Sequence, residues 1–414
     1  MRIAVLSLDT RGGIQPYVAL ALGLQRAGHD VRMVAPSDFM PMMKEWGLPA
    51  APLSGSIEAA LRQSGGATEK GALASIRFSQ RESARYVRLW TGEILAACEG
   101  VELMTGGVGG MVAGGSVAEK LGVPFLQTHL QPIGAPTAAF PGVLLPGMPA
   151  WLGPLGRRFS HALTEFGLWA PFKGAMRQAR TEVLGLPARS APPKREPPVL
   201  YGFSPEVIPL PKEWGSRRHI TGYWTLPAGP SWSPPPALEA FLGAGPPPVC
   251  IGFGSMTSSD PQAMTRLVLE AVRRAGVRAV LLSGWGALGE VARDDVFVAA
   301  EAPHEWLYPK MAAVVHHGGA GTTGAALRSG VPAIVVPFTM DQPFWGGRVA
   351  ALGVGPRPIP RKRLSVEALA AALQQTVADA AMRARAAALG ARIRAEDGVG
   401  QAVAHFERFA REGS

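Results

Sequence analysis

Two stretches of this chain share one pattern, in which an apolar strand runs into a glycine-containing turn, a helix and a second strand. The first stretch begins with a strand at residues 2–8, passes through the turn 9–13 and reaches a second strand at 30–35. The second stretch begins at residues 248–255 and continues with a helix at 261–275. Strand, helix and strand in this order form a parallel sheet covered by helices. The pattern therefore predicts two doubly wound α/β domains.

The rest of each half repeats this order and suggests where the domains divide. A glycine-rich turn precedes a short helix at 116–121, and in the second half a helix is expected to start near Thr322. Proline-rich segments at 191–198 and 227–248 lie between the halves and suit stiff connections. We therefore expect three parts: a first domain at 1–215, a second domain at 216–395, and a C-terminal helix at 396–414 that packs back on the first domain.

Composition excludes several classes of protein. Of 414 residues, 47% are hydrophobic and 17% charged, so the chain has ample material for buried cores. Two cysteines cannot build a disulfide framework, which favours a reducing compartment. No apolar run resembles a signal peptide or reaches the length of a membrane span. These features predict a soluble, cytoplasmic protein.

The chain is basic, with 41 Lys and Arg against 31 Asp and Glu and a net charge of +10. No basic motif interleaved with aromatic residues is present, so we expect no nucleic-acid partner. Attraction to anionic substrates or to anionic lipid surfaces fits the charge equally well. A coding bias towards arginine explains it too, and the oligomeric state is left open.

The most specific motif is His-His-Gly-Gly-Ala-Gly-Thr-Thr at residues 316–323, directly after an apolar strand at 312–315. Glycines allow backbone N–H groups to approach an anion, and a helix that begins in the same turn points its positive end there. Because no Gly-Lys-Ser/Thr follows, this is not a Walker motif. The alternative is a tight turn alone, which requires neither the histidines nor the threonines. The motif predicts a phosphate site.

Two further turns follow strands of the same half. Gly-Phe-Gly-Ser-Met at 252–256 is a second candidate cradle for an anion. In the segment 337–345, Asp341 and Gln342 offer an acceptor and a mixed donor and acceptor side by side, which suits sugar hydroxyls. The alternative for Asp341 is a helix N-cap.

Together these three turns resemble the nucleotide-sugar-binding half of family 1 glycosyltransferases, and the resemblance covers nearly the whole chain. Residues 303–307, 316–323 and 341–345 look most like the bacterial and fungal sterol glucosyltransferases, which are related to the glycopeptide-antibiotic glycosyltransferases. The N-terminal residues 10–12 and 15–17 look like that branch as well. The resemblance implies a GT-B fold: two facing Rossmann-like, doubly wound domains with an interdomain cleft.

The resemblance also implies that 1–215 is the acceptor-binding domain and that 216–395 is the nucleotide-sugar-binding domain, with a donor site for UDP-glucose. Its residues would be Ser255, Trp285, His304, His317, Gly319, Gly321, Thr322, Asp341 and Gln342. His317, Thr322, Ser255 and the glycine backbone would hold the diphosphate, Asp341 and Gln342 the sugar, and Trp285 and His304 would lie near the uracil. The reaction implied is inverting hexosyl transfer to a hydroxyl of a sterol or similar apolar aglycone. Because no Asp-x-Asp occurs, we expect no metal and no cofactor besides the donor substrate.

The chain departs from the family at the catalytic base. The loop of the sterol branch usually reads Gly-Ser-Arg-Gly-Asp, and its final aspartate is the candidate base. Here residues 9–13 read Asp-Thr-Arg-Gly-Gly, so the carboxylate expected at Gly13 is missing. Asp9 opens the same loop and becomes the predicted base, with a loop cap as the alternative. His129 is the reserve candidate, and a structural histidine fits that position as well.

The acceptor side is predicted from an apolar, proline-rich segment at 140–151 that is not expected to form a regular element. Phe140 and Trp151, together with Gly12 and Gly13, are the candidate acceptor-binding residues. The segment could instead touch a membrane peripherally or form a packed loop. A polyketide, flavonoid or glycopeptide aglycone is the alternative acceptor. Outside enzymes, the alternative is a sugar-nucleotide-binding protein that lacks a base.

Overall fold

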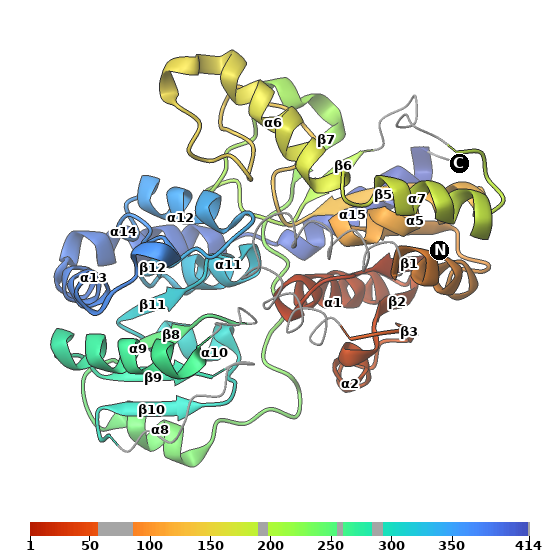
Figure 1. Ribbon diagram of the computed structural model, residues 1–414. Coiled ribbons are helices and arrows are strands. Elements are labelled where there is room, and N and C mark those ends of the chain that lie inside the picture. Colours follow the sequence, from red (N-terminus) through yellow and green to blue (C-terminus); the bar gives the residue numbers. More distant parts are fainter. Residues whose placement is uncertain (57–85, 189–197, 255–259, 284–292, 413–414) are drawn as a thin grey trace. The chain divides into compact units, whose positions relative to one another are not determined.

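The computed structural model describes residues 1–56, 86–188, 198–254, 260–283 and 293–412. The chain divides into two compact units, of which unit 1 comprises residues 1–225 with 397–414 and unit 2 comprises 226–396 (Figure 1). Unit 1 extends beyond residue 215 because the strand β7 (Arg218–Ile220) is the edge strand of its sheet. Within the described ranges, no helix combines the length and apolarity that crossing a bilayer requires.

Unit 1 is built on a parallel sheet with the strand order β3-β2-β1-β4-β5-β6-β7. Its other strands are β1 (Arg2–Leu6), β2 (Asp30–Pro36), β3 (Ala50–Leu53), β4 (Leu103–Gly106), β5 (Phe125–His129) and β6 (Val199–Tyr201). Its α-helices are α1 (Arg11–Arg26), α2 (Met40–Glu45), α5 (Val108–Leu121), α6 (Gly153–Trp169), α7 (Lys173–Gln178) and α15 (Gly398–Glu412). The chain reverses its direction of winding between β1 and β4.

The helix predicted at 116–121 is the last part of α5, whereas the glycine-rich turn predicted before it is wrong, because those glycines are helical and α5 begins at Val108. A Cβ at Gly110 would lie 2.9 Å from the carbonyl oxygen of Leu6, and one at Gly114 would lie 2.5 Å from the Leu6 side chain. The glycines therefore let α5 approach β1 closely. At the far end of the chain, α15 packs on α1, where a Cβ at Gly23 would lie 2.2 Å from Val399.

Unit 2 has a parallel sheet with the order β10-β9-β8-β11-β12. Its strands are β8 (Val249–Gly252), β9 (Ala279–Leu282), β10 (Val296–Ala299), β11 (Ala313–His316) and β12 (Ala333–Val335). Its α-helices are α8 (Pro236–Gly243), α9 (Pro261–Ala275), α10 (His304–Leu307), α11 (Ala320–Ser329), α12 (Gln342–Ala351), α13 (Val366–Ala378) and α14 (Ala380–Arg394). The helix predicted at 261–275 is confirmed.

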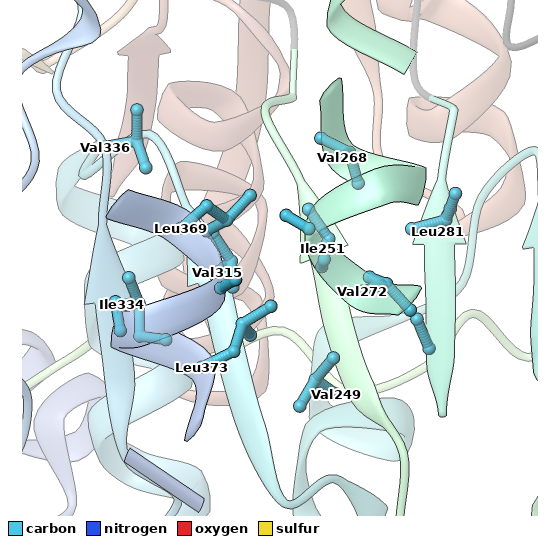
Figure 2. Packing of buried hydrophobic residues seen from close by; sticks show 14 of the residues in the cluster. Val249, Ile251, Val268, Val272, Leu281, Val315, Ile334, Val336, Leu369 and Leu373 are labelled. Carbon is cyan, nitrogen blue, oxygen red and sulfur yellow. The ribbon is translucent and has the colours of Figure 1, made fainter. Parts of the chain in front are cut away.

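Both faces of the second sheet are buried. On one face Val249 and Ile251 pack with residues of α9 and α13 in a single apolar cluster (Figure 2). The alternate residues Cys250 and Val314 point to the other face and are fully buried as well. Strands covered on both faces read as continuous apolar runs, which is how these strands read in the sequence. The prediction of two doubly wound α/β domains is confirmed.

A glycine contact between helices gives a test of this packing. A Cβ at Gly390 in α14 would lie 2.5 Å from Cα of Gly330 at the end of α11. We expect Gly390→Ala to lower the free energy of unfolding by about 1–3 kcal/mol, because the two backbones must separate. The matched control is Gly347→Ala in α12, where a Cβ meets nothing within 4 Å and alanine should stabilise by up to about 1 kcal/mol. Urea unfolding followed by circular dichroism measures both unfolding free energies. An equal change in the two variants would contradict the close contact between α14 and the end of α11.

Candidate functional site

The carboxyl ends of the central strands of unit 2 are level with one another. In the ladder, His316 of β11 pairs with Gly252 of β8 on one side and with Val335 of β12 on the other. The chain winds outward from β8 to β10 and then returns to β11, so β8 and β11 form the topological switch point of the sheet. Ligands of open α/β sheets bind at this point, outside the strand ends.

The turn after β11 is held in one conformation by its first histidine and by a glycine. The buried His316 ring accepts a hydrogen bond at Nδ1 from the Gly318 N–H, over 3.0 Å. Gly318 has φ +93°, and a Cβ there would lie 2.7 Å from Val335 and 3.0 Å from the carbonyl oxygen of Gln342. Backbone conformation and space therefore both require glycine at this position.

The second histidine joins the turns after β8 and β11. A Cβ at Gly319 would lie 2.5 Å from Nε2 of His317, and a Cβ at Gly254 would lie 3.2 Å from its Cε1. The imidazole thus occupies space that side chains at these two glycines would take. Burial lowers the pKa of His317 to about 4, so the ring is neutral near pH 7. It can offer a hydrogen bond to an anion but not a positive charge.

Helix α11 begins in this turn, at Ala320, two residues before the predicted start near Thr322. Gly319 is its N-cap residue, and no side chain caps the helix. The first backbone N–H groups of a helix have no partner within it and carry the positive end of its dipole. Thr322 lies half-buried in the first turn, and Gly321 precedes it. This end of α11 can therefore receive an anion.

Several polar atoms at the strand ends are buried and unsatisfied. Among the described residues, Nδ1 of His317, Nε2 of His316 and Oγ1 of Thr323 have no hydrogen-bond partner. A buried polar atom without a partner costs free energy, and native proteins carry few of them. The imidazole of His317 together with the α11 N-terminus is a donor set that fits phosphate oxygens.

The third turn lies between β12 and α12 and carries Asp341 and Gln342. Gln342 Oε1 accepts hydrogen bonds from the N–H groups of Phe338 and Thr339, at 2.8 and 3.1 Å. Asp341 stands at the N-cap position of α12 but makes no capping hydrogen bond, and its Oδ2 instead accepts from Trp345 Nε1 at 2.9 Å. Met340, half-exposed beside them, has φ +57°. Such a conformation is strained for a residue with a side chain, and strain of this kind gathers at ligand sites.

The remaining donor candidates are only partly described. His304 begins α10, and its ring stacks on Tyr308 with ring centroids 4.3 Å apart. A salt bridge of 2.6 Å between Glu305 and Arg328 ties α10 to α11. Ser255 and Trp285 lie outside the described residues.

In unit 1 the corresponding switch point lies between β1 and β4, and Asp9 follows β1 there. Its Oδ1 accepts hydrogen bonds from the backbone N–H and the hydroxyl of Thr10, at 2.6 and 3.3 Å. A Cβ at Gly13 would lie 2.3 Å from both Cγ and Oδ2 of Asp9. The carboxylate of Asp9 therefore fills the space where a side chain at position 13 would begin. Gly12, by contrast, has nothing within 4 Å of a Cβ.

Asp9 has an unusual electrostatic environment. Its side chain reaches solvent, yet desolvation by the surrounding protein raises the pKa of the carboxylate, and the two hydrogen bonds from Thr10 only partly oppose this. The negative charge of Asp9 in turn contributes to the raised pKa of the buried Tyr17, whose main cause is burial. The Tyr17 hydroxyl donates to the Thr128 carbonyl at 2.6 Å and so anchors α1 to β5. Apart from the tyrosine of the resembling motif, no signal in the sequence indicates this support.

The other candidates of unit 1 are spread over its interior and surface. His129 is buried, and its Nε2 lies 3.3 Å from Gln127 Oε1; burial lowers its pKa to about 3. Phe140 is buried too and packs edge-on against His161 and Trp214. Trp151, on the contrary, is 83% exposed. The acceptor-binding roles of Phe140 and Trp151 stay predictions, as does the reserve role of His129.

Comparison with known families gives a match that covers much of unit 2 and the beginning of α15. Residues 286–405 match the family described as erythromycin biosynthesis protein CIII-like, C-terminal domain. The matched range contains the turn 316–323 and the turn that carries Asp341 and Gln342.

Curated relatives match nearly the whole chain. A sterol 3-beta-glucosyltransferase of Emericella nidulans is 37% identical over 424 residues, which cover 97% of this chain and 29% of that protein. The sterol 3-beta-glucosyltransferase of Neurospora crassa is 34% identical and is covered to 27%. The chain therefore spans less than a third of the length of the curated relatives it matches.

Solved structures show the same fold in glycosyltransferases. Glycosyltransferase VinC, in complex with dTDP, superposes with a TM-score of 0.68 at 21% identity and full coverage of both chains. SsfS6 from Streptomyces sp. SF2575, in complex with thymidine diphosphate, gives a TM-score of 0.67 at 22% identity over 99% of both chains. The calicheamicin glycosyltransferase CalG4 gives 0.68 at 18% identity, covering 100% of this chain and 99% of that one.

The buried His316 predicts acid sensitivity. Burial, with smaller effects of His317 and His304, lowers the pKa of His316 to about 3, whereas an unfolded chain protonates histidine near pH 6.5. Between these values the unfolded state binds more protons, so stability falls as the pH falls. The variant His316→Asn keeps an acceptor for the Gly318 N–H, but its side chain does not bind a proton in this pH range. From pH 7 to pH 5 we expect wild type to lose about 2 kcal/mol more unfolding free energy than the variant. Urea titrations at both pH values test this, and equal losses would contradict it.

Proposed function

Because the chain belongs to the glycosyltransferases of the GT-B fold that are related to the sterol 3-beta-glucosyltransferases, we propose that it transfers glucose from UDP-glucose to a hydroxyl of a sterol or similar apolar aglycone. The proposal assigns the donor to unit 2 and the activation of the acceptor to unit 1. The observation that carries it is the turn 316–323 at the switch point of unit 2, with its uncapped helix and its unsatisfied imidazole.

In this proposal the turn after β11 holds the diphosphate of the donor. His317 Nδ1 and the first N–H groups of α11 would donate to phosphate oxygens, while Asp341 and Gln342 would bind the sugar hydroxyls. As UDP leaves, negative charge grows on the phosphate, and fixed donors aimed at it stabilise the transition state. His317 is neutral, so it contributes a directed hydrogen bond throughout the reaction.

The attacking hydroxyl needs a group that takes its proton. We assign this role to Asp9, because its carboxylate stands at the switch point of unit 1 with a raised pKa. The hydroxyl oxygen attacks the anomeric carbon, the bond from that carbon to the phosphate oxygen breaks, and the proton passes to Asp9. Attack from the face opposite the leaving group inverts the anomeric configuration.

We propose that the reaction needs neither a metal nor a cofactor, because N–H donors meet the charge of the diphosphate. Within the described residues, no three His, Cys, Asp or Glu side chains gather where they could hold a metal ion. We also propose that the protein works in the cytoplasm, with peripheral contact to a membrane where a lipid-dissolved acceptor is reached. The buried free thiols of Cys98 and Cys250 suit a reducing compartment.

Mass spectrometry tests the proposed activity directly. Purified protein is incubated with UDP-glucose and, separately, with sterols, flavonoids, macrolides and a glycopeptide aglycone, with and without a chelator. We expect a hexose on a sterol and the same yield with the chelator. A hexose only on another acceptor would overturn the sterol assignment. If UDP binds and no acceptor gains a hexose, the chain acts as a sugar-nucleotide-binding protein. His317→Ala serves as the donor-site control and should weaken UDP binding.

The base assignment is tested by exchanging the two loop positions. Asp9→Gly should lower kcat by about 10²–10⁴-fold, the range that a positioned base contributes. Adding Gly13→Asp recreates the spacing of the resembling family and returns a carboxylate to the same space, so part of the rate should recover. The matched control is Asp30→Asn at the amino-terminal end of β2, away from the carboxyl ends of the strands where Asp9 lies, which should keep the wild-type rate.

The pH profile provides a second readout of the same residue. A base must be deprotonated, so kcat/KM should fall as the pH drops through the pKa of Asp9, which desolvation raises from its ordinary value. This acid limb should vanish in Asp9→Gly, while UDP affinity stays unchanged. Retention of the wild-type rate by Asp9→Gly, or no recovery in a correctly folded double variant, would disprove the assignment.

A further inference from the structure

Helix α6 (Gly153–Trp169) turns its polar side inward. Ser160, His161 and Thr164 are buried, although the helix also carries large apolar side chains. Ser160 Oγ accepts from the Gly142 N–H at 2.8 Å, and His161 Nε2 donates to the Phe140 carbonyl at 3.0 Å. The polar side of α6 is therefore the side that fastens it to unit 1.

A further hydrogen bond strengthens this attachment. The Arg157 guanidinium, on the same side of α6, donates to the Ala138 carbonyl at 3.0 Å. The segment that α6 holds is the apolar, proline-rich loop, which enters the helix through a short 3-10 turn at Ala150–Leu152. These hydrogen bonds fix the rotation of the helix about its axis. They therefore turn the opposite side of α6 away from unit 1.

The outward side of α6 is apolar. Leu155 is 81% exposed, Phe159 61%, Leu163 41% and Phe166 72%, and Trp151 stands one turn before them. Their spacing of four, four, four and three residues places them on one side of a helix. Surface helices of water-soluble proteins have the opposite arrangement, with the apolar side in the core. A contiguous exposed apolar stripe of this kind marks an interaction surface.

Charge indicates what covers the stripe. Residues 150–178 carry four Lys or Arg and one acidic residue, and the whole chain has a net charge of +10. Arg158, next to Phe159 of the stripe, is exposed and forms a salt bridge of 3.9 Å with Glu213, and Lys173 and Arg177 are exposed on the next helix, α7. Trp and Phe with a basic border are typical of helices that lie in the interface of a bilayer, where anionic headgroups attract the cations.

We propose that the outward side of α6 is a docking surface that inserts into the surface of an anionic phospholipid bilayer. The side chains of Leu155, Phe159, Leu163 and Phe166 enter the region between headgroups and acyl chains, and Trp151 lies at the headgroup level. The helix lies parallel to the membrane. This inference rests on the proposed function only for the purpose of membrane binding, which is access to an acceptor dissolved in lipid. Binding to the bilayer itself requires neither donor nor acceptor.

Two other occupants are weaker fits. A second copy of the chain would typically bury about 800 Å² on each partner. A single stripe along one helix is narrow for that, and its basic border would face the same border of the copy. An acceptor molecule would be expected to enter a concave, largely preformed pocket rather than an exposed convex helix face. Both occupants remain distinguishable by experiment.

The test is flotation of the full chain with vesicles, without any substrate. Vesicles of phosphatidylcholine containing about one third phosphatidylglycerol should bind the protein, whereas pure phosphatidylcholine should bind it less and about 1 M salt should release part of it. The variant Phe159→Ser with Phe166→Ser should bind at least about tenfold more weakly, because it lacks two large apolar side chains whose transfer from water into the bilayer favours binding. The matched control is Leu210→Ser, a 50% exposed leucine of the same unit outside the stripe, which should bind like wild type.

Further readouts separate the outcomes. The double variant should keep the circular dichroism spectrum and unfolding midpoint of wild type, because both phenylalanines are exposed. Unchanged vesicle binding by a folded double variant would overturn the proposal. A wild-type dimer that the double variant converts to a monomer, without vesicle binding, would assign the stripe to a second copy. Loss of transfer to a water-soluble acceptor, without any effect on flotation, would assign it to the acceptor. Vesicle binding without any glucosyl transfer would contradict the proposed function and leave the docking surface in place.

Discussion

Close approach of glycine backbone to functional side chains at the ends of parallel strands is the constraint on which both candidate sites depend. In unit 2, His317 can lie between the turns after β8 and β11 only because Gly254 and Gly319 carry no side chain. In unit 1, Asp9 occupies the space beside Gly13 for the same reason. The parallel register brings the strand ends level, and the glycines leave room for the side chain of His317 at one switch point and of Asp9 at the other.

These sites and helix α6 share a departure from the rules that stabilise a folded chain. His316, His317 and Thr323 keep buried polar atoms without partners among the described residues, and Met340 holds a positive φ. Such features cost free energy, and they lie where a ligand would repay it. The reversed polarity of α6 is the same kind of departure at the surface. Departures from local rules are expected at functional regions. They are not confined to the proposed sites, since Oγ1 of Thr376 in α13 and Nδ1 of His129 in β5 are also buried without a partner among the described residues.

The exchange between positions 9 and 13 shows what a family pattern can and cannot transfer. The loop of the resembling family has its carboxylate at the position of residue 13, so the sequence alone indicates that the catalytic carboxylate is missing. Asp9 lies in the turn before α1, and Gly13 lies in the first turn of that helix. The structure shows that the two side chains would occupy the same space, because a Cβ at Gly13 would lie 2.3 Å from the Asp9 carboxylate. A carboxylate at position 9 can therefore occupy the space that a side chain at position 13 would enter, and this supports the proposal of Asp9 as the base.

Sequence by itself determined what depends on local order: two parallel sheets, helix 261–275 with its boundaries, and the turn 316–323 between a strand and a helix. Apolar runs, glycines and prolines act on their own neighbours, so their effect can be read along the chain. Tertiary structure alone decided that the glycines after Val108 are helical, that Phe140 is buried and that α6 turns its apolar side outward. These outcomes depend on contacts between distant residues, such as Leu6 with Gly110 and Phe140 with His161, and such contacts leave no periodic trace in the sequence.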